Sequence, residues 1–146
     1  MPYHEEGGAV NWSECSLRVW LNDTFLGTAF SMDERAAILE TTVDNGPEQG
    51  RADWIADGGA ETRDRIFLLS YHEAFEVYFG SDGDRTCLLT GVASGHGAFG
   101  WWWLRSPGEI RRFASVVDKT GQANEYSVVS VGAVRPALWV DLAGIY

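Results

Sequence analysis

The sequence predicts an α+β fold, and two patterns lead to that prediction. Amphipathic segments with helix-capping residues occupy the first half of the chain, whereas short apolar or alternating runs separated by turn residues fill the last third. Helices followed by a run of strands are typical of this class. The length of 146 residues fits one domain over 1–146. It is enough to bury about two-thirds of the unfolded surface, so the core needs no metal or disulfide.

The first half of the chain contains two predicted helices. Ser13 is a candidate cap for a helix over residues 14–22, whose apolar residues cover a broad face. Ser31–Glu34 has the pattern of a capping box, which predicts a short helix over 33–38. Residues 37–43 end in a run of β-branched side chains and are expected to be extended.

The middle of the chain combines two long loops with a strand and a helix. Residues 44–64 form a polar, glycine-rich stretch, and loops of this length in a domain are often binding elements. The almost wholly apolar run 65–69 predicts a buried strand. Ser70–Glu73 is a second capping box, and it opens a helix that Gly80 is expected to end. A second long stretch, 81–100, is rich in glycine and serine.

The last third of the chain predicts four strands. They are expected at 101–105, 112–118, 126–131 and 134–140. Residues 118–122 predict a hairpin turn with its glycine in the left-handed region. These strands should form a small twisted antiparallel sheet beside two or three helices.

The charge balance limits the partners. Eleven basic residues stand against twenty-one acidic ones, which gives a net charge of −10. Such a surface repels phosphate backbones and anionic lipids, so no nucleic acid and no direct membrane insertion are expected. The sequence leaves the oligomeric state and the localisation open. A cell-surface or extracellular place would need a signal or anchor outside this chain.

The cysteines and histidines do not show metal-ligand spacing. Cys15 and Cys87 are far apart in sequence, so two free buried thiols are favoured over a structural disulfide. The histidines at 4, 72 and 96 pair with neither cysteine in the sequence. The acidic residues of the two long loops offer oxygen ligands for calcium without the spacing of an EF-hand. No cofactor is therefore expected, with calcium as the alternative.

Two arginines and three tryptophans in the predicted strands each allow two interpretations. Arg105 and Arg135 lie in apolar strands, where a charge needs a partner. Both could tie strands to loops through Asp64 or Glu73, which is favoured, or they could clamp a ligand carboxylate. The consecutive tryptophans 101–103 cannot all face one side of a strand. They are expected to pack the core and anchor loops, or to provide an aromatic platform for a ligand.

The pattern WWLRSPG at 102–108, followed by a hairpin and VRPALW at 134–139, resembles a bacterial domain family of unassigned function. Segments 16–25, 64–70 and 73–80 fit the same family, and the resemblance spans about residues 12–142. Family members usually have glycine where this chain has Ala133, and they carry a preceding strand that is missing here. These departures indicate a trimmed or diverged member.

That family is in turn similar to the C-type-lectin-like fold of the formylglycine-generating enzymes. The same fold is the scaffold of variable proteins that retroelements diversify. The resemblance therefore implies a C-type-lectin-like binding scaffold more than an enzyme. The formylglycine-generating enzymes bind copper through a cysteine pair, and Cys15 and Cys87 lie outside the corresponding region of this sequence.

These observations lead us to expect a non-catalytic domain that recognises a protein or glycan on another cell or phage. Its binding face would come from residues 96–131 and could be diversified by a retroelement. The alternatives are a copper-dependent relative of the formylglycine-generating enzymes and a structural module of a larger surface protein. The residues expected on the face are His96, Phe99, Trp101, Trp103, Glu109, Ile110, Arg111, Arg112, Phe113, Asn124 and Tyr126. The expected core includes Leu17, Trp20, Leu21, Phe67, Leu69, Phe75, Trp102, Val128, Leu138 and Trp139.

Overall fold

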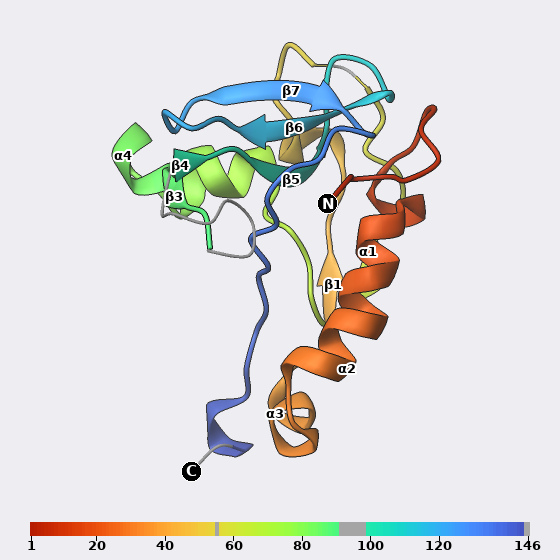
Figure 1. Cartoon of the computed structure of the whole chain (residues 1–146), viewed down its shortest axis with the longest axis vertical. Helices are drawn as coiled ribbons and strands as arrows, with labels where there is room; N and C mark the ends of the chain where they lie inside the picture. The colour runs from red at the N-terminus through yellow and green to blue at the C-terminus, as the bar shows by residue number, and fades with distance from the viewer. Residues whose placement is uncertain (55, 91–98, 145–146) are drawn as a thin grey trace.

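Three antiparallel strands, β5 (Trp102–Pro107), β6 (Phe113–Val117) and β7 (Ala123–Ser127), form a meander in the order β5-β6-β7. They lie at one end of the molecule in the computed structural model, which describes residues 1–54, 56–90 and 99–144 (Figure 1). Short helices and small antiparallel sheets make up the rest of the described chain, so the α+β prediction is confirmed. The third predicted strand lies at 123–127 rather than 126–131.

The turn between β6 and β7 confirms the predicted hairpin. The N–H of Asp118 donates to the carbonyl of Gln122 at 2.8 Å, and the Asp118 carboxylate accepts from the N–H groups of Thr120 and Gln122 at 2.8 and 3.0 Å. Burial raises the pKa of Asp118, but a hydrogen bond from the Thr120 hydroxyl at 2.6 Å and the backbone hydrogen bonds outweigh it, and the pKa lies below its ordinary value. Gly121 has a φ of +87°, and a Cβ there would lie 1.9 Å from the carbonyl oxygen of Asp82. Only glycine fits this position.

Both faces of the β5–β7 sheet are covered. On one face Trp103 and Val116 join the larger core, which also contains Tyr3 of the N-terminal segment. On the other face Trp102 packs in a second core with Ala74 of the neighbouring helix. Alternation along a strand explains this division, and it confirms that the consecutive tryptophans face opposite sides.

The first helical segment is longer than predicted and begins later. It runs through α1 (Ser16–Trp20), the π-helical turn η2 (Leu21–Phe25) and α2 (Leu26–Ala29), after a single turn η1 (Trp12–Glu14). Ser13 does not cap it, because the Ser13 hydroxyl donates to the side chain of Asn11 at 2.5 Å. Asn22 and Asp23 do not stop the helix at residue 22, because the Asn22 side chain donates to the carbonyls of Arg18 and Ile66 and the backbone continues as a π-helical turn. The helix ends where the backbone becomes extended after Ala29.

The first capping box and the extended segment after it are confirmed. In α3 (Met32–Ala37) the N–H of Glu34 donates to the Ser31 hydroxyl at 3.2 Å, and the Glu34 carboxylate accepts from the Ser31 N–H at 2.7 Å. Strand β1 (Thr41–Val43) pairs antiparallel with β2 (Thr62–Asp64). This pairing shortens the predicted loop to residues 44–61, which include the single turn η3 (Pro47–Gln49).

The second capping box also forms, ahead of a π-helical segment. The Ser70 hydroxyl accepts from the N–H of Glu73 at 3.1 Å at the start of η4 (Glu73–Val77), which ends before Gly80. The remaining elements are short and have these bounds: α4 (Asp82–Arg85), β3 (Cys87–Leu88), β4 (Phe99–Gly100) and η5 (Leu142–Gly144).

The predictions of regular strands at 65–69 and 134–140 are wrong. They meet at a single bridge, in which Phe67 and Ala137 exchange backbone hydrogen bonds of 3.0 and 2.8 Å. Pro136 has no N–H to extend this ladder. Beyond the bridge the C-terminal segment leaves the sheet and runs towards α3 (Figure 1), where the N–H of Asp141 donates to the carbonyl of Ala37 at 2.8 Å.

The predicted core is largely confirmed, with one correction. Fully buried members are Leu17, Leu21, Phe67, Trp102 and Val128, and partly buried ones are Trp20, Leu69, Phe75 and Leu138. Trp139 is 51% exposed, so its placement in the core was wrong. The segment that carries it pairs only at isolated bridges, which leaves one side of the indole uncovered.

Replacing Gly121 with alanine tests the hairpin. We expect Gly121→Ala to lower the free energy of unfolding by about 2–4 kcal/mol, because it adds left-handed strain to a steric clash. Gly27→Ala is the matched control. Gly27 lies within α2 with open space around its Cα, so alanine should stabilise the chain by about 0.5–1 kcal/mol. Urea unfolding followed by circular dichroism measures both, and equal effects at the two positions would contradict this account.

Candidate functional site

The guanidinium of Arg105 holds the loop that begins at residue 44 against the sheet. Arg105 lies on β5 and is only 4% exposed. Its Nε donates to the side-chain oxygen of Asn45 at 3.1 Å, and its Nη2 donates to the carbonyl of Asp44 at 2.8 Å. Its Nη1 donates to the carbonyl of Leu68 at 2.9 Å and forms an ion pair with Glu73. The predicted tie between Arg105 and Glu73 is confirmed.

Asp64, the other carboxylate considered for these arginines, pairs with Arg18 instead. Its side chain is 1% exposed and forms an ion pair with Arg18 at 2.7 Å. It also accepts hydrogen bonds from the indole N–H of Trp12 at 2.9 Å and from the hydroxyl of Thr62 at 2.6 Å. Asp64 therefore joins α1 to β2 and is not a partner of Arg105.

Arg135 has no carboxylate partner among the described residues, so the predicted tie is wrong for this arginine. Its Cζ lies 4.8 Å from the ring centre of Phe79 and 4.9 Å from that of Trp102. Two aromatic rings thus take the place of the expected carboxylate.

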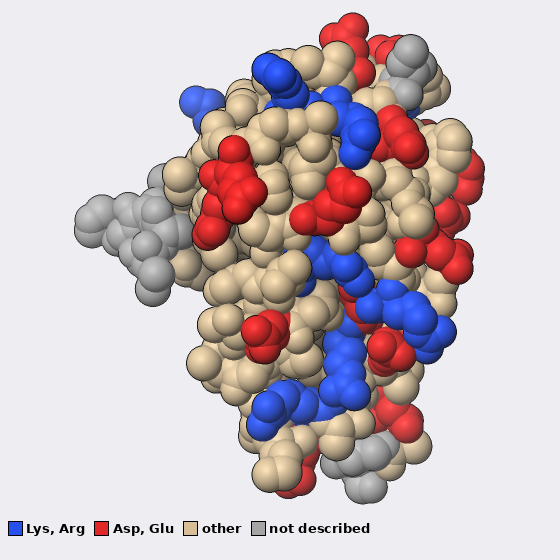
Figure 2. Space-filling view, turned by 90° about the vertical axis from the view of Figure 1, so that its right-hand side faces the viewer, with Lys and Arg blue, Asp and Glu red and all other residues tan. Residues whose placement is uncertain are grey.

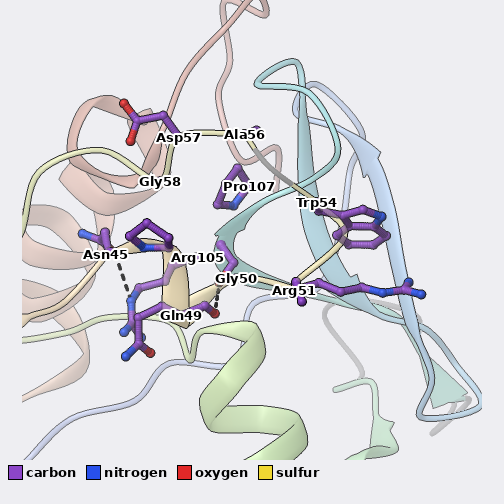
Figure 3. Close-up of a pocket in the computed structure, with 14 residues that line it drawn as sticks. Asn45, Gln49, Gly50, Arg51, Trp54, Ala56, Asp57, Gly58, Arg105 and Pro107 are labelled. Atoms are coloured by element: carbon purple, nitrogen blue, oxygen red, sulfur yellow. Dashed lines mark hydrogen bonds between the residues drawn. The ribbon is translucent and has the colours of Figure 1, made fainter.

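Loop 44–58 and the end of β5 enclose a cavity of about 320 Å³, which we call the loop cavity (Figure 3). Arg105 and Asn45 lie on one side, Pro107 lies between, and Arg51 and Trp54 lie on the opposite side. Ser106 fastens the loop here, because its hydroxyl donates to the carbonyl of Gln49 at 3.0 Å. The volume is within the range of small-ligand sites.

On the side of the loop cavity formed by Arg51 and Trp54, an aromatic ring pairs with a charge, and both side chains extend away from Pro107 (Figure 3). The Cζ of Arg51 lies 4.8 Å from the centre of the Trp54 ring, and the Arg51 Nε forms an ion pair with Asp53 at 2.8 Å. Gln49 lies deeper in the loop, where its side-chain oxygen accepts from the Ser70 hydroxyl at 2.7 Å. Asp57, on the exposed part of the loop, accepts from the N–H of Gly59 at 2.9 Å. Our sequence prediction placed binding elsewhere, although the loop's length was the signal that indicated this segment.

The structure spreads the predicted binding-face residues along the sheet. Phe99, 56% exposed, precedes β5, whereas Ile110, 50% exposed, follows it. The six residues of β5 separate these two positions by about 20 Å. Trp103, between them, is fully buried and has no surface for a ligand. His96 lies outside the described residues.

The other predicted face residues divide between an aromatic cluster and the β5–β6 turn. The rings of Trp101 and Tyr126 are 4.7 Å apart, and both are partly buried. Arg111 reaches Glu14 at 3.5 Å, at the turn end of the sheet. The remaining members range from half-buried to exposed, and they are Phe113, Glu109, Arg112 and Asn124.

The two cysteines are free thiols in different environments. Cys15 is fully buried in the larger core, and burial raises its pKa to about 12. Cys87 packs beside the second core, on the other face of the sheet. The structure forms no disulfide between them and does not bring them together as a copper pair. Within residues 1–54, 56–90 and 99–144, no group of three or more histidine, cysteine and acidic side chains is placed to hold a metal.

The distribution of surface charge and the length of the helices were the two features expected to limit the classes of partner. On the face shown in Figure 2, acidic side chains are spread over the surface and basic ones lie between them. The net charge of the chain is −10, so the molecule as a whole still disfavours polyanions. Among the helices that the structure describes, none is long and apolar enough to cross a membrane.

Comparison with known families identifies a match over nearly the whole chain. Residues 1–142 match the family described as Domain of unknown function (DUF6273). The chain belongs to this family. The match agrees with the resemblance to a family of unassigned function and extends it to the N-terminus. Neither the curated proteins nor the solved structures contain a match to this DUF6273 domain.

Arg105→Met tests whether this buried arginine holds the DUF6273 domain together. We expect a loss of about 3–5 kcal/mol in the free energy of unfolding, because the substitution leaves Glu73 and three backbone or side-chain acceptors without their donor. Arg63→Met is the control, since Arg63 pairs with Glu40 at 2.9 Å while both side chains remain more than half exposed. Arg63→Met should lower the free energy of unfolding by about 0–1 kcal/mol, because the pair is exposed to solvent. Denaturant unfolding of both variants gives the comparison, and a similar cost for the two would refute the structural role of Arg105.

Thiol alkylation tests the burial of Cys15. With its pKa raised to about 12, only about one Cys15 in ten thousand is a thiolate at pH 8, and the thiolate is the reactive form. We expect iodoacetamide to modify Cys87 in the folded chain and to reach Cys15 only after denaturation. Mass spectrometry of tryptic peptides measures both sites. Rapid labelling of Cys15 in the native chain would show that the core opens there.

Proposed function

We propose that this DUF6273 domain is a non-catalytic ligand-binding domain and that its loop cavity binds a glycan. The observation that carries the proposal is the cavity itself, a concave site of about 320 Å³ with Trp54 among its lining residues. It lies where a long polar loop crosses a buried strand. Sites of this kind combine apolar surface with a few placed polar groups.

The polar groups at the base of the loop cavity support binding rather than chemistry. Arg105, Asn45 and Ser106 use their side chains to hold the loop, through the hydrogen bonds described above. Their role is to fix the shape of the cavity. A site whose shape is set before the ligand arrives loses less conformational entropy on binding.

The groups that remain available fit a sugar ring. The amide nitrogen of Gln49 and one carboxylate oxygen of Asp57 make no hydrogen bond with the described residues. An amide and a carboxylate are the donor and acceptor that sugar hydroxyls need, and the Trp54 ring offers an apolar face for stacking. The overall negative charge favours neutral or basic glycans over acidic ones.

Protein recognition is the second candidate, and one feature favours it. Ile110 is 50% exposed on the β5–β6 turn, with the exposed Arg112 close behind it in sequence. Arginine and large apolar residues are common anchors of protein interfaces. The turn follows Pro107, which lines the loop cavity, so a protein partner seated on the cavity could reach it.

Saturation-transfer NMR with free mono- and disaccharides tests the glycan proposal. We expect at least one saccharide to receive saturation from the unmodified chain. Its affinity should fall about tenfold or more in Trp54→Ala, because a stacked aromatic ring is a typical main contact of a binding site.

Trp139→Ala is the matched control, since Trp139 is 51% exposed and does not line the loop cavity. It should leave saccharide binding unchanged. No binding across the saccharide set, or binding that survives Trp54→Ala, would overturn the proposal. Binding of a protein that depends on Ile110 but not on Trp54 would favour the second candidate.

A further inference from the structure

A second cavity, of about 680 Å³, lies beside the start of β5 and shares no lining residue with the loop cavity. We call it the apolar cavity. Trp102 lines it from β5 and Trp101 from the residue before that strand, and Leu88 and Leu89 line it from β3 and the residue after it. Trp20 and Phe25 of the first helical segment, together with Val134, complete most of the apolar wall. This volume also falls within the range of small-ligand sites.

Arg135 is the charged side chain on the wall of the apolar cavity. Its guanidinium makes no hydrogen bond or ion pair with the described residues, and its Nη1 is buried without a partner. The described lining contains no aspartate or glutamate. Residues 91–98, which lie outside the described chain, have the sequence GVASGHGA and carry no acidic side chain.

The unpaired state of the half-buried Arg135 contrasts with the state of the two buried arginines. Arg85, 7% exposed, forms an ion pair with Asp82, and Arg105, 4% exposed, forms one with Glu73. A cation in an apolar environment is costly unless an anion pairs with it. The rings of Phe79 and Trp102 offset part of this cost for Arg135, but they satisfy none of its N–H donors. The Nε and Nη2 of Arg135 also make no hydrogen bond with the described residues and, unlike Nη1, are not buried. Arg135 therefore presents a positive charge with donors that a ligand can use.

We propose that the apolar cavity binds a small organic monocarboxylate with an apolar body. The carboxylate pairs with the guanidinium of Arg135, which can donate two parallel hydrogen bonds to it. The apolar body lies against Trp101, Leu88 and Leu89. Met1 also lines the cavity, but its N-terminal ammonium donates to the carbonyl of Gly132 at 2.7 Å. The unpaired Arg135, in a chain of net charge −10, therefore matches one negative charge better than two. This site is separate from the proposed glycan site and uses different chemistry.

Calorimetric titration with octanoate and with 1-octanol tests the proposal on the unmodified chain. The two probes share an alkyl body and differ in charge. We expect octanoate to bind about 10- to 100-fold more tightly, which is the effect of a charge-assisted hydrogen-bonded pair. Equal affinities, or no binding of octanoate, would overturn the proposal without any substitution. Failure here would leave the saccharide experiment unaffected, since the two cavities share no residue.

Substitution at Arg135 then locates the site. Arg135→Gln should weaken octanoate binding about 10-fold or more, while Arg135→Lys should recover part of it because the charge remains. Arg65→Gln is the matched control, since Arg65 is exposed and lines neither cavity. Thermal unfolding checks that each variant is folded.

Octanoate binding that is unchanged by Arg135→Gln would place the carboxylate elsewhere and refute the proposal. A peptide with a free apolar C-terminus that binds where octanoate does not would assign the cavity to the end of a partner protein. That result would also overturn the small-molecule proposal.

Discussion

The ion pair and hydrogen bonds of Arg105 are the interaction on which the arrangement of this domain depends. One guanidinium joins β5 to residues 44–45, to residue 68 and to Glu73 at the start of η4. Ser106 adds hydrogen bonds to residues 49 and 71, and these segments also meet through apolar packing, which has little directional preference. Because hydrogen bonds do have directional preference, Arg105 sets the position of loop 44–58 over the sheet. Arg105 at the floor of the loop cavity therefore serves mainly to hold these segments together, because its donors are used by protein partners.

Burial of the sheet on both faces explains the composition of its motif. Antiparallel sheets commonly expose one face to water and alternate polar with apolar residues. In β5 every residue from Trp102 to Pro107 is buried, so the sequence shows no alternation there. Trp102 and Trp103 fill separate cores on the two sides. Arg105 and Ser106 are the polar members, and both are satisfied by partners outside the sheet.

Local signals in the sequence predicted local structure well. Both capping boxes, the hairpin turn and the division of the tryptophans depend on residues close in sequence, and each is confirmed. The tie from Arg105 to Glu73 was predictable because a buried charge needs a counter-charge. The irregular conformation of segment 65–69 was not predictable. An apolar run has the same composition whether it forms a regular strand or pairs with its neighbour at one isolated bridge. The wall formed by Arg51 and Trp54 depends on loop geometry that sequence spacing does not specify.

The ties of Arg105 also order events during synthesis. Its hydrogen-bond partners at Asn45 and Asp44 precede it by 60 and 61 residues. A ribosome releases the loop first and the strand much later, so the loop cannot close over a floor that has not yet emerged. Closing such a long segment must lose chain entropy before any contact compensates for it, which slows folding. The nascent chain thus carries the polar loop 44–58 without its partner strand for the whole interval until β5 emerges.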